Sequence, residues 1–341
     1  MTKPLLLCSS LDPVSALFVV DSPRTQSLIT ELRRLSPVPV HAIPNDPEHP
    51  SDVWMQDTVE FAVRGKTPVA LLGLRGKHDR GLTCGPLDSR VTSYLSEKLP
   101  QVERLQLGEA LGGRRWIDWY GNLEVSPPVP GFPHGRILTG RQKELTFHPA
   151  VLDFLEKQKA QWPPVFVDVS WLTIGHVDEV VNFVPASDGR GWRVLLPNPD
   201  AAASALQDLA NNQPVFVGQH GETTVGKLRE LAQNAEQQQV RAALAATRAQ
   251  LKSELGIESE DIVSLPALFS EGLAVIPNPV NCLVVGKTIL MPDPSFAPFR
   301  RAIATALAAL GLTVHFLDIW EPYHTASGEV HCGTNALRFR R

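Results

Sequence analysis

The chain has few cysteines and almost no excess of charge of either sign. Of its 341 residues only 4 are cysteines, and 32 Lys and Arg against 36 Asp and Glu give a net charge of −4. The cysteines have no regular spacing, which excludes a disulfide framework and a paired Cys-x-x-Cys zinc site. A chain of this kind is typical of a reducing compartment, so we expect a cytoplasmic protein.

Long apolar runs and long basic runs are also missing. The most extended apolar stretches, such as residues 302–312, fall well below the ~20 residues that span a bilayer, and the short apolar run near residue 5 is too brief for a signal peptide. Basic side chains form only short clusters, and Phe339 beside one of them is a single aromatic ring. We therefore expect no membrane span and no nucleic-acid groove.

Strand and helix patterns alternate along the chain, which predicts an α/β fold. Helices are expected from Ser22-Pro23 onwards, over residues 223–255 as one amphipathic helix or a helix pair, and over residues 299–310. The predicted strands are residues 16–20, 38–43, 165–169, 193–196 and 313–317. No fixed-period repeat or low-complexity linker interrupts the pattern, so one compact unit over residues 1–341 is expected.

The octapeptide at residues 328–335 (GEVHCGTN) holds Cys332 among small and polar residues. Such a setting suits a nucleophilic thiol, with Gly333 allowing close approach of a substrate and Thr334 and Asn335 offering hydrogen bonds near the sulfur. The alternative is a solvent-exposed tail thiol. Cys8 and Cys282 lie in apolar runs and are predicted to be buried packing residues, whereas Cys84 stays undecided.

His176 and Asp178 follow a strong strand pattern and are two residues apart. In extended backbone their Cα atoms would be about 6.6 Å apart on one face, so that an imidazole and a carboxylate flank one small polar group. The alternative is a strand edge with two solvated side chains. The valines around them favour burial, which requires partners for both groups.

Asp57 is a second polar residue in apolar surroundings, since it lies between Trp54, Met55 and Val59. Burial of its carboxylate would require a cation or a donor beside it. If this segment is a strand, Asp57 faces away from its neighbours Gln56 and Thr58. Two carboxylates, an imidazole and a thiol with a tryptophan wall suit a guanidinium, because each carboxylate accepts a bidentate pair of N–H bonds while a thiolate attacks the central carbon.

These segments resemble the catalytic module of the protein-arginine deiminases. The shared motifs are residues 54–57 (WMQD), 121–128 (GNLEVSPP), 168–179 (DVSWLTIGHVDE) and 328–335, with weaker similarity at 254–257 and 280–287. The resemblance implies an α/β-propeller of five pseudo-symmetric ββαβ-type blades. It also implies a single catalytic domain over residues 1–341, without the amino-terminal immunoglobulin-like domains of the animal enzymes.

The resemblance assigns a role to each motif residue. Peptidyl arginine would be hydrolysed to citrulline and ammonia through an S-alkylthiouronium on Cys332, with His176 as general acid and base. The residues that would hold the substrate are Asp57 and Asp178 at the guanidinium, Trp54 and Ile174 along the side-chain channel, and Arg80 at the substrate backbone. An arginine-containing protein or peptide is thus the expected partner.

The resemblance further implies calcium. One site matches the side chains of Gln56, Glu60 and Glu124 with backbone oxygens of Tyr120 and Leu123, and oxygen ligands suit this ion. In a straight strand residues 56 and 60 would be about 13 Å apart, so the chain must bend there. A second family site is expected to be lost, because Thr58 replaces an acidic ligand and Arg75 and Gly76 stand where Asp and Ser are expected.

Other readings stay open. Arginines of some relatives are replaced by His78 and Ala326, which leaves the substrate range undecided. A deiminase or amidinotransferase acting on a small guanidine, such as free arginine or agmatine, would use the same residue types. A zinc-binding protein using His324, His331 and Cys332 lacks a fourth ligand and a compact motif. An inactive relative is a third possibility, although all four chemical positions are present.

Overall fold

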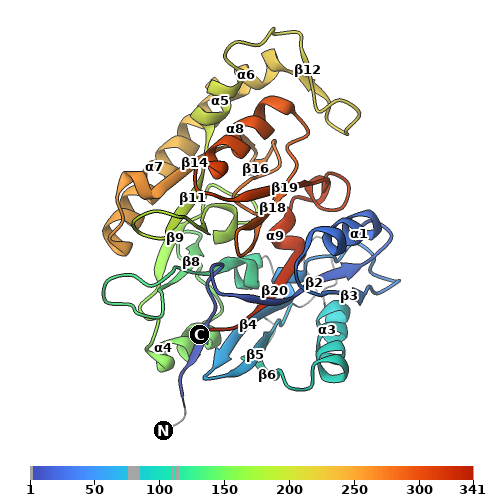
Figure 1. Ribbon diagram of the computed structural model, residues 1–341, viewed down its shortest axis with the longest axis vertical. Coiled ribbons are helices and arrows are strands. Elements are labelled where there is room, and N and C mark those ends of the chain that lie inside the picture. Colours follow the sequence, from blue (N-terminus) through green and yellow to red (C-terminus); the bar gives the residue numbers. More distant parts are fainter. Residues whose placement is uncertain (1–2, 76–84, 110, 112–114, 341) are drawn as a thin grey trace.

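The chain is an α/β protein in which three-stranded sheets recur. The computed structural model describes residues 3–75, 85–109, 111 and 115–340 (Figure 1). In each of five sheets within this described part, a central strand has one antiparallel neighbour and one parallel neighbour. The parallel neighbour follows after a helical crossover, as parallel pairing requires.

Each of the five units can be followed by its strands and its crossover helices. The first unit consists of β20 (Thr334–Arg338), β2 (Val14–Asp21), α1 (Gln26–Leu35) and β3 (Val40–Pro44). The second consists of β4 (Val59–Arg64), β5 (Thr67–Leu72), α3 (Gly85–Lys98) and β6 (Glu103–Gln106), with β1 (Leu5–Leu7) added beside β4. The third consists of β7 (Leu123–Val125), β8 (Ile137–Arg141), α4 (Pro149–Gln158) and β9 (Val165–Asp168).

The two remaining units form the upper part of the molecule in Figure 1. The fourth consists of β10 (Asn182–Pro185), β11 (Trp192–Asn198), α5 (Pro199–Leu206), α6 (Val225–Gln233), α7 (Ala235–Leu255) and β14 (Ile262–Pro266). The fifth consists of β17 (Leu283–Val285), β18 (Thr288–Pro292), α8 (Ala297–Ala308) and β19 (Thr313–Leu317). Two short hairpins accompany them, β12 (Pro214–Val215) with β13 (Thr223–Thr224) and β15 (Phe269–Ser270) with β16 (Leu273–Ala274).

Short turns lead into the first strand of several units. Three of them are α2 (Met55–Thr58) before β4, a 3₁₀ turn at Tyr120–Asn122 before β7, and α9 (Val330–Gly333) before β20. A fourth is the 3₁₀ turn Val177–Glu179 before β10. The turn at α2 packs against α9 and against the turn at Tyr120–Asn122, which in turn contacts the one at Val177–Glu179. The entry turns of different units therefore meet inside the molecule.

Central strands are buried on both faces, which explains the strand patterns in the sequence. In β2 the five residues from Ala16 to Val20 are all buried, and six of the seven residues of β11 are buried. The predicted strands at 16–20, 38–43, 165–169 and 193–196 are confirmed to within three residues, and the strand at 313–317 is confirmed with its bounds.

The predicted helices are present with shifted bounds, and the one expected over residues 299–310 is α8 at Ala297–Ala308. The helix α1 begins after Thr25 and not at Ser22-Pro23, because the hydroxyl of Thr25 donates to the carbonyl of Val20 and holds a turn before the helix. The segment 223–255 is a helix pair, since Asn234 ends α6 and accepts the N–H of Gln237 at the start of α7. Gly256 ends α7 in the left-handed conformation, which glycine adopts without strain.

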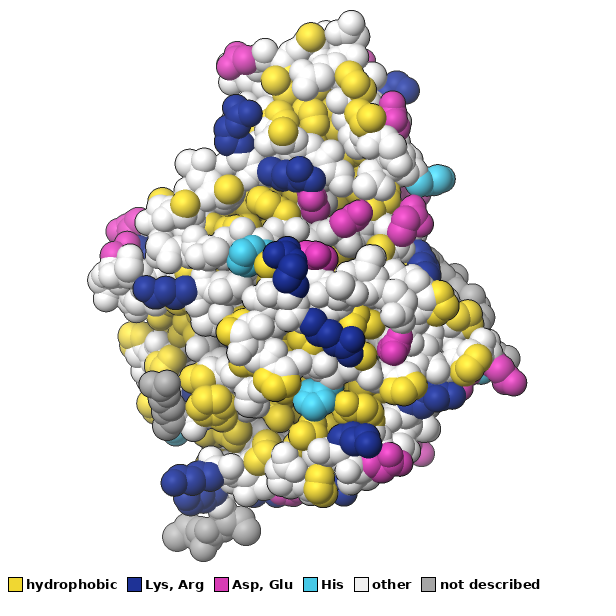
Figure 2. Space-filling view, turned by 45° about the vertical axis from the view of Figure 1, so that its right-hand side comes forward, with side chains coloured by type: hydrophobic (Ala, Val, Ile, Leu, Met, Phe, Trp, Pro, Cys, Tyr) yellow, Lys and Arg dark blue, Asp and Glu magenta, His cyan; other side chains and the backbone are white. Residues whose placement is uncertain are grey.

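The second and the last strands of the chain, β2 and β20, belong to the same sheet. Leu17 in β2 pairs with Ala336 in β20, so that residues more than 300 positions apart lie side by side (Figure 1). Among the described residues, no helix is long and apolar enough to span a membrane. Lys and Arg side chains are scattered between acidic and apolar ones on the face in Figure 2 and do not form a continuous patch there.

Candidate active site

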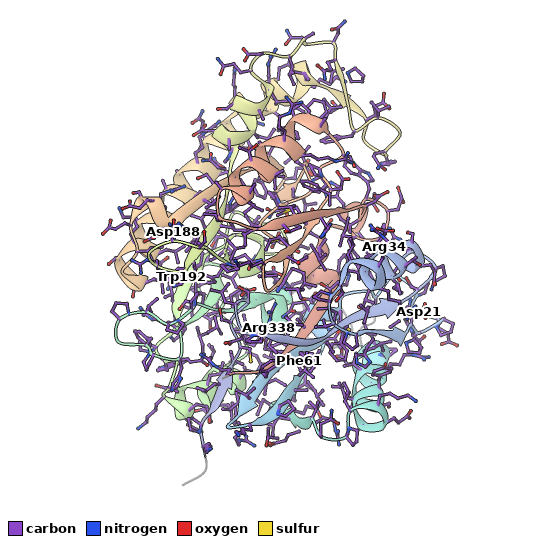
Figure 3. All side chains as sticks on the ribbon, viewed as in Figure 1. Asp21, Arg34, Phe61, Asp188, Trp192 and Arg338 are labelled. Carbon is purple, nitrogen blue, oxygen red and sulfur yellow. The ribbon has the colours of Figure 1, made fainter. Side chains whose placement is uncertain are left out.

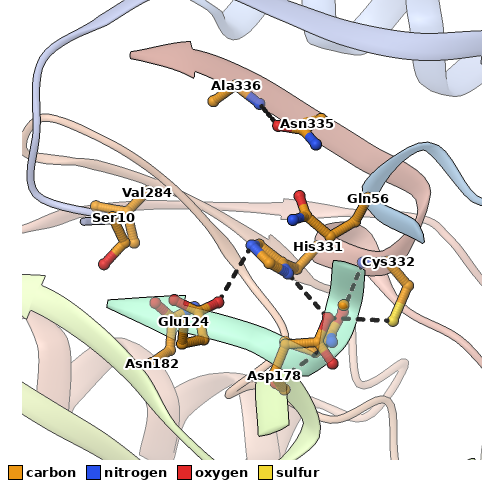
Figure 4. Close-up of polar contacts among 12 residues, drawn as sticks. Ser10, Gln56, Glu124, Asp178, Asn182, Val284, His331, Cys332, Asn335 and Ala336 are labelled. Carbon is orange, nitrogen blue, oxygen red and sulfur yellow. Dashed lines mark hydrogen bonds and ion pairs between the residues drawn. The ribbon is translucent and has the colours of Figure 1, made fainter. Parts of the chain in front are cut away.

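The four predicted chemical groups meet at the entry turns. A cavity of about 200 Å³ is lined by ten residues: Trp54, Asp57, Trp116, Trp119, Ile174, His176, Ala326, Ser327, Gly328 and Cys332. Asp178 lies directly behind it, with one carboxylate oxygen 3.7 Å from the sulfur of Cys332 (Figure 4). The other oxygen of Asp178 is buried and has no hydrogen-bond partner among the described residues. An unsatisfied buried carboxylate oxygen is suited to accept an N–H from a bound cation.

The pair His176 and Asp178 is placed by a turn and not by a strand. His176 is extended, but Val177–Glu179 forms a 3₁₀ turn, and the Glu179 carboxylate accepts the N–H groups of Gly175 and His176 at 3.0 and 2.8 Å. Both His176 and Asp178 are 1% exposed. The expectation of an extended pair was wrong, and the alternative of a solvated strand edge is excluded by this burial.

The segment around Asp57 is also a turn. Residues 55–58 form α2, in which the hydroxyl of Thr58 donates to the carbonyl of Trp54 at 2.8 Å, and the strand β4 starts only at Val59. The bend required between residues 56 and 60 is therefore present. It brings Nε2 of Gln56 within 2.8 Å of a carboxylate oxygen of Glu60. The side-chain alternation of a strand therefore applies only from Val59 onwards.

The imidazole of His176 has a defined orientation. Its Nε2 lies 2.7 Å from the carbonyl oxygen of Trp116, so this nitrogen carries a proton, and its Nδ1 lies 3.6 Å from a carboxylate oxygen of Asp57. Burial opposes protonation of this ring, but the carboxylates of Asp57, Asp178 and Glu179 outweigh it and raise the pKa of His176 above its ordinary value. Nδ1 is thus the nitrogen that exchanges a proton with the pocket.

Burial and neighbouring carboxylates raise the pKa values of Asp57 and of the Cys332 thiol. Burial, with a contribution from Asp178, raises the pKa of Asp57 to about 6 against the attraction of His176. Burial together with the carboxylates of Asp178 and Asp57 raises the pKa of the Cys332 thiol well above its usual range. A cation bound between Asp57 and Asp178 would lower both pKa values, because it stabilises the ionised carboxylate and the thiolate.

Gly121 leaves room between these groups. A Cβ atom added at this position would lie 2.6 Å from Nδ1 of His176, 2.8 Å from Asp57 and 3.3 Å from Asp178. The backbone N–H of Gly121 also donates to Asp57 at 3.2 Å. The motif at residues 121–128 was noticed in the sequence, but the role of this glycine in it was missed.

Cys332 lies on α9 and is held by Asn281. The Asn281 side chain accepts the N–H of Cys332 at 3.1 Å and donates to the backbone oxygen of Asp178 at 3.3 Å. Cys332 is 8% exposed, so the alternative of an exposed tail thiol is excluded. Asn281 lies in a weakly similar segment of the sequence, and nothing local in the chain marks it as a partner of the thiol.

The expected roles of the residues after Cys332 were wrong. The space beside Gly333 is filled by the ring of Tyr323, which a Cβ would meet at 2.1 Å. The Thr334 hydroxyl donates to the carbonyl of Val330 at 2.6 Å, and the Asn335 amide donates to the carbonyl of Val59 at 2.6 Å. These residues fasten α9 and β20 to their neighbours and do not surround the sulfur.

The remaining cysteines and the channel residues also have a place. Cys8 and Cys282 are buried free thiols, as predicted. Trp54 and Ile174 line the cavity, together with Trp116 and Trp119, which the sequence analysis missed. Arg80, Cys84 and His78, and likewise Gly76, lie outside the described residues.

The predicted calcium ligands surround a second, small cavity of about 30 Å³. Gln56, Glu60, Leu123 and Glu124 line it, while the carbonyl of Tyr120 accepts the N–H of Leu123 one turn away. Burial and the repulsion between the two carboxylates raise the pKa of Glu60 to about 8, and burial raises that of Glu124 to about 7. Two buried carboxylates with raised pKa values and a neighbouring amide fit an oxygen-binding cation.

Basic side chains border the same cavity, but the pKa values of Glu60 and Glu124 stay raised beside them. The buried guanidinium of Arg338, near the centre of Figure 3, donates to the carbonyls of Ser10, Asp12 and Val284. Nδ1 of His331 lies 2.9 Å from a carboxylate oxygen of Asp178, and Nε2 of the same imidazole lies 3.5 Å from a carboxylate oxygen of Glu124 (Figure 4). Among the residues that the structure describes, no three His, Cys, Asp or Glu side chains form a metal centre.

The histidines of the zinc hypothesis have different partners. Nδ1 of His331 bonds Asp178, whereas Nδ1 of His324 bonds Glu329 at 2.8 Å. The two imidazoles are therefore held by separate carboxylates.

Two solved structures superpose on this chain over nearly its whole length. The chain superposes with a TM-score of 0.58 and 15% identity on a putative arginine deiminase from Porphyromonas gingivalis, covering 99% of this chain and 100% of the other. It superposes with a TM-score of 0.56 and 14% identity on a C. jejuni agmatine deiminase with substrate bound, covering 98% of this chain and 96% of the other. At these identities the likeness shows the fold, which is that of the deiminases.

Sequence comparison gives the family. The profile described as protein-arginine deiminase (PAD) matches residues 2–340. The chain is 34% identical over 330 residues to protein-arginine deiminase type-4 of Mus musculus and 37% identical over 327 residues to type-3 of Homo sapiens, in both cases over 85% of this chain and 47% of the relative. The chain thus belongs to the protein-arginine deiminase family, and it spans about half the length of these relatives.

Proposed function

We propose that this chain hydrolyses peptidyl arginine to peptidyl citrulline and ammonia. The observation that carries the proposal is the convergence of Cys332, His176, Asp57 and Asp178 on one pocket with tryptophan walls, in a chain of this family. The pocket volume of about 200 Å³ suits one side chain and not a whole peptide. The polypeptide part of the substrate would therefore stay outside, near Ala326 and Ser327.

Binding would pair the guanidinium with the two carboxylates. Asp57 and Asp178 accept its N–H groups, including at the unpartnered oxygen of Asp178, and the rings of Trp54 and Trp119 flank the apolar stem. The bound positive charge lowers the pKa of the Cys332 thiol and so favours the thiolate. The substrate itself thereby activates its nucleophile.

The chemistry then proceeds in two halves. The Cys332 sulfur forms a bond to the central guanidinium carbon, and the tetrahedral intermediate expels one nitrogen, which leaves as ammonia after Nδ1 of His176 has protonated it. The remaining S-alkylthiouronium is attacked by water, whose proton returns to Nδ1. Breaking the C–S bond releases citrulline and the thiol.

We also propose one bound calcium ion. Gln56, Glu60 and Glu124 would hold it with the backbone oxygens of Leu123 and Tyr120, and its charge would neutralise the two buried carboxylates. Loss of a second site is supported by Arg75, whose guanidinium already lies between the carboxylates of Asp52 and Asp88. Calorimetry with calcium tests this: Glu124→Gln should weaken binding, whereas the exposed control Glu144→Gln should not.

The five repeated units support a five-bladed propeller formed by a single catalytic domain over residues 1–341. Their matching strand order and the meeting of their entry turns both agree with blades around one axis. A cytoplasmic location is supported by the free thiols of Cys8, Cys282 and Cys332, which a reducing compartment preserves. Nucleic acid is not an expected partner, in keeping with the scattered basic side chains in Figure 2.

The deciding experiment compares a blocked arginine peptide with free arginine and agmatine. We expect citrulline and ammonia from the blocked peptide with calcium, little with chelator, and none from Cys332→Ala. The buried Cys282→Ala variant is the matched control and should keep the activity. Turnover of only the small guanidines would replace the proposal by a small-molecule deiminase, and turnover by Cys332→Ala would overturn the mechanism.

A further inference from the structure

A buried ion cluster lies behind the pocket walls and is not explained by the chemistry above. Arg75 follows β5, and its side chain is 1% exposed. Its Nη1 and Nη2 bond the two carboxylate oxygens of Asp52 at 3.1 and 3.0 Å, and its Nε bonds Asp88 on α3 at 2.9 Å. The guanidinium thus joins three separate segments of the chain.

One branch of the cluster leads to the first wall of the pocket. The Asp52 carboxylate accepts the backbone N–H of Trp54, and the Trp54 ring lines the cavity. On its other side this ring packs so closely on the backbone of Gly328 that a Cβ there would lie 2.3 Å from it. The ring therefore has little freedom as long as Asp52 stays fixed.

The other branch leads to a second tryptophan that lines the pocket. The central carbon of the Arg75 guanidinium lies 5.2 Å from the centre of the Trp119 ring, a cation–π arrangement, and Trp119 lines the same cavity. The Trp119 ring centre is 6.5 Å from that of His176. One buried guanidinium is thus in contact with Trp119 and is linked through Asp52 to Trp54, and both tryptophans line the cavity.

We propose that Arg75 is a positioning residue for the arginine pocket: through Asp52 it fixes Trp54, and through the face of its guanidinium it fixes Trp119. It thereby sets the affinity for the substrate side chain and leaves the rate of the chemical steps largely unchanged. The proposal deepens the proposed function and rests on it. A lysine cannot take this role, because a single ammonium lacks the planar fork that holds Asp52 and the face that meets the ring.

The test is the kinetics of citrulline formation from a blocked arginine peptide. We expect Arg75→Met to raise KM about tenfold, which corresponds to about 1.4 kcal/mol, while kcat changes less than about twofold. Arg75→Lys should raise KM almost as much. Arg75→Met and Trp119→Leu should be non-additive in KM, because each removes the same contact.

Arg193→Met is the matched control. Arg193 is also buried and pairs with Asp188 and Asp261, on the left of Figure 3 where Asp188 and Trp192 are labelled, but neither it nor its partners line the pocket. It should lower the melting temperature and leave KM unchanged. The proposal fails, and Arg75 is only a structural residue, if Arg75→Met and Arg193→Met raise KM equally for the same loss of melting temperature. It also fails if the effects of Arg75→Met and Trp119→Leu on KM are additive in the double variant.

A binding measurement separates this proposal from the proposed function. In the Cys332→Ala background, calorimetry with the blocked arginine peptide should show weaker binding when Arg75→Met is added. If the wild type binds this peptide but does not convert it, the proposed function fails while the role of Arg75 stands. If Arg75→Met does not fold, Asp88→Asn, which keeps the bond to Asp52, should raise KM by a smaller factor. Absence of peptide binding, or an unchanged KM in these variants, overturns the inference.

Discussion

The space at the centre of the site is provided by a residue without a side chain. Around Gly121 the imidazole of His176 and the carboxylates of Asp57 and Asp178 leave no room for a methyl group. Gly121→Ala should therefore displace at least one of them and lower kcat/KM by about a hundredfold or more, since a misplacement of about 1 Å has an effect of this size. Citrulline formation from a blocked arginine peptide measures it.

The control for this substitution is Gly189→Ala, because a Cβ there meets no atom within 4 Å. It should leave kcat/KM and the melting temperature nearly unchanged. If Gly121→Ala retains full activity, the arrangement of the three groups around this glycine is not the catalytic one.

The raised pKa of Asp57 predicts an acidic limit of activity. Its carboxylate must be ionised to hold a guanidinium, and its pKa in the empty pocket is about 6. As the pH falls through about 6, kcat/KM should therefore fall, whereas kcat, measured with bound substrate, should fall only at lower pH because the bound cation lowers this pKa. A pH profile of both constants checks this, and an acidic limb that is equal in both constants would contradict it.

Residue identities in the site were easier to predict than residue contacts. Cys332, His176, Asp57 and Asp178 each stand in a polar motif within apolar sequence, and this local contrast marks them. Asn281 and Arg75 act through partners far away in the chain, and no local pattern encodes such contacts. Gly333 lies in the expected motif, but the space beside it is filled by Tyr323 and is not open to a substrate.

At the scale of single elements, the site consists of short turns, whereas the sequence analysis considered extended backbone for Asp57 and for the pair His176 and Asp178. Residues 54–61 carry β-type side chains, but the hydroxyl of Thr58 satisfies the carbonyl of Trp54, and the N–H of Gly73 takes the carbonyl of Thr58 at 2.7 Å. The first bond is local to α2 and the second joins the end of α2 to the residue after β5, so together they hold the turn ahead of β4. Regular elements away from the site, such as the strand at 313–317, follow their patterns closely because nothing competes with their pairing.

The turn at α2 can be weakened without touching a polar side chain of the site. Thr58→Val removes the hydroxyl but keeps the shape, so the carbonyl of Trp54 loses its partner at a cost of about 1 kcal/mol. We expect about tenfold lower kcat/KM, because Asp57 and Gln56 lie in the same turn. Thr92→Val removes an equivalent bond in α3, to Asp88 at 2.9 Å, and should have little effect on activity. Equal activities of both variants would refute this reading of α2.

At the scale of the whole molecule, several buried carboxylates make stability depend on pH. The pKa is raised to about 8 for Glu60 and to about 7 for Glu124 and Glu179, in each case first by burial. An unfolded Glu has a pKa near 4.3, so between this value and the folded values the native state binds more protons than the unfolded state. Their contribution to stability is therefore full below about pH 4 and is lost as the pH rises through 7 to 8.

This linkage predicts how calcium affects stability. In chelator the melting temperature should fall as the pH rises from 6 to 9, and calcium should restore it most at the alkaline end, where Glu60 and Glu124 are ionised. Thermal melts at several pH values, with calcium and with chelator, provide the measurement. A calcium effect that is equal at all pH values would place the ion away from these two carboxylates.

The pairing of β20 with β2 determines when the site is assembled. Asp57, His176 and Asp178 precede the nucleophile by more than 150 residues along the chain, and α9 is held in place by the strand that closes the first sheet. A chain without β20 therefore has the two carboxylates and the imidazole but not the fastened sulfur. The four groups meet in one pocket only once β20 has paired with β2.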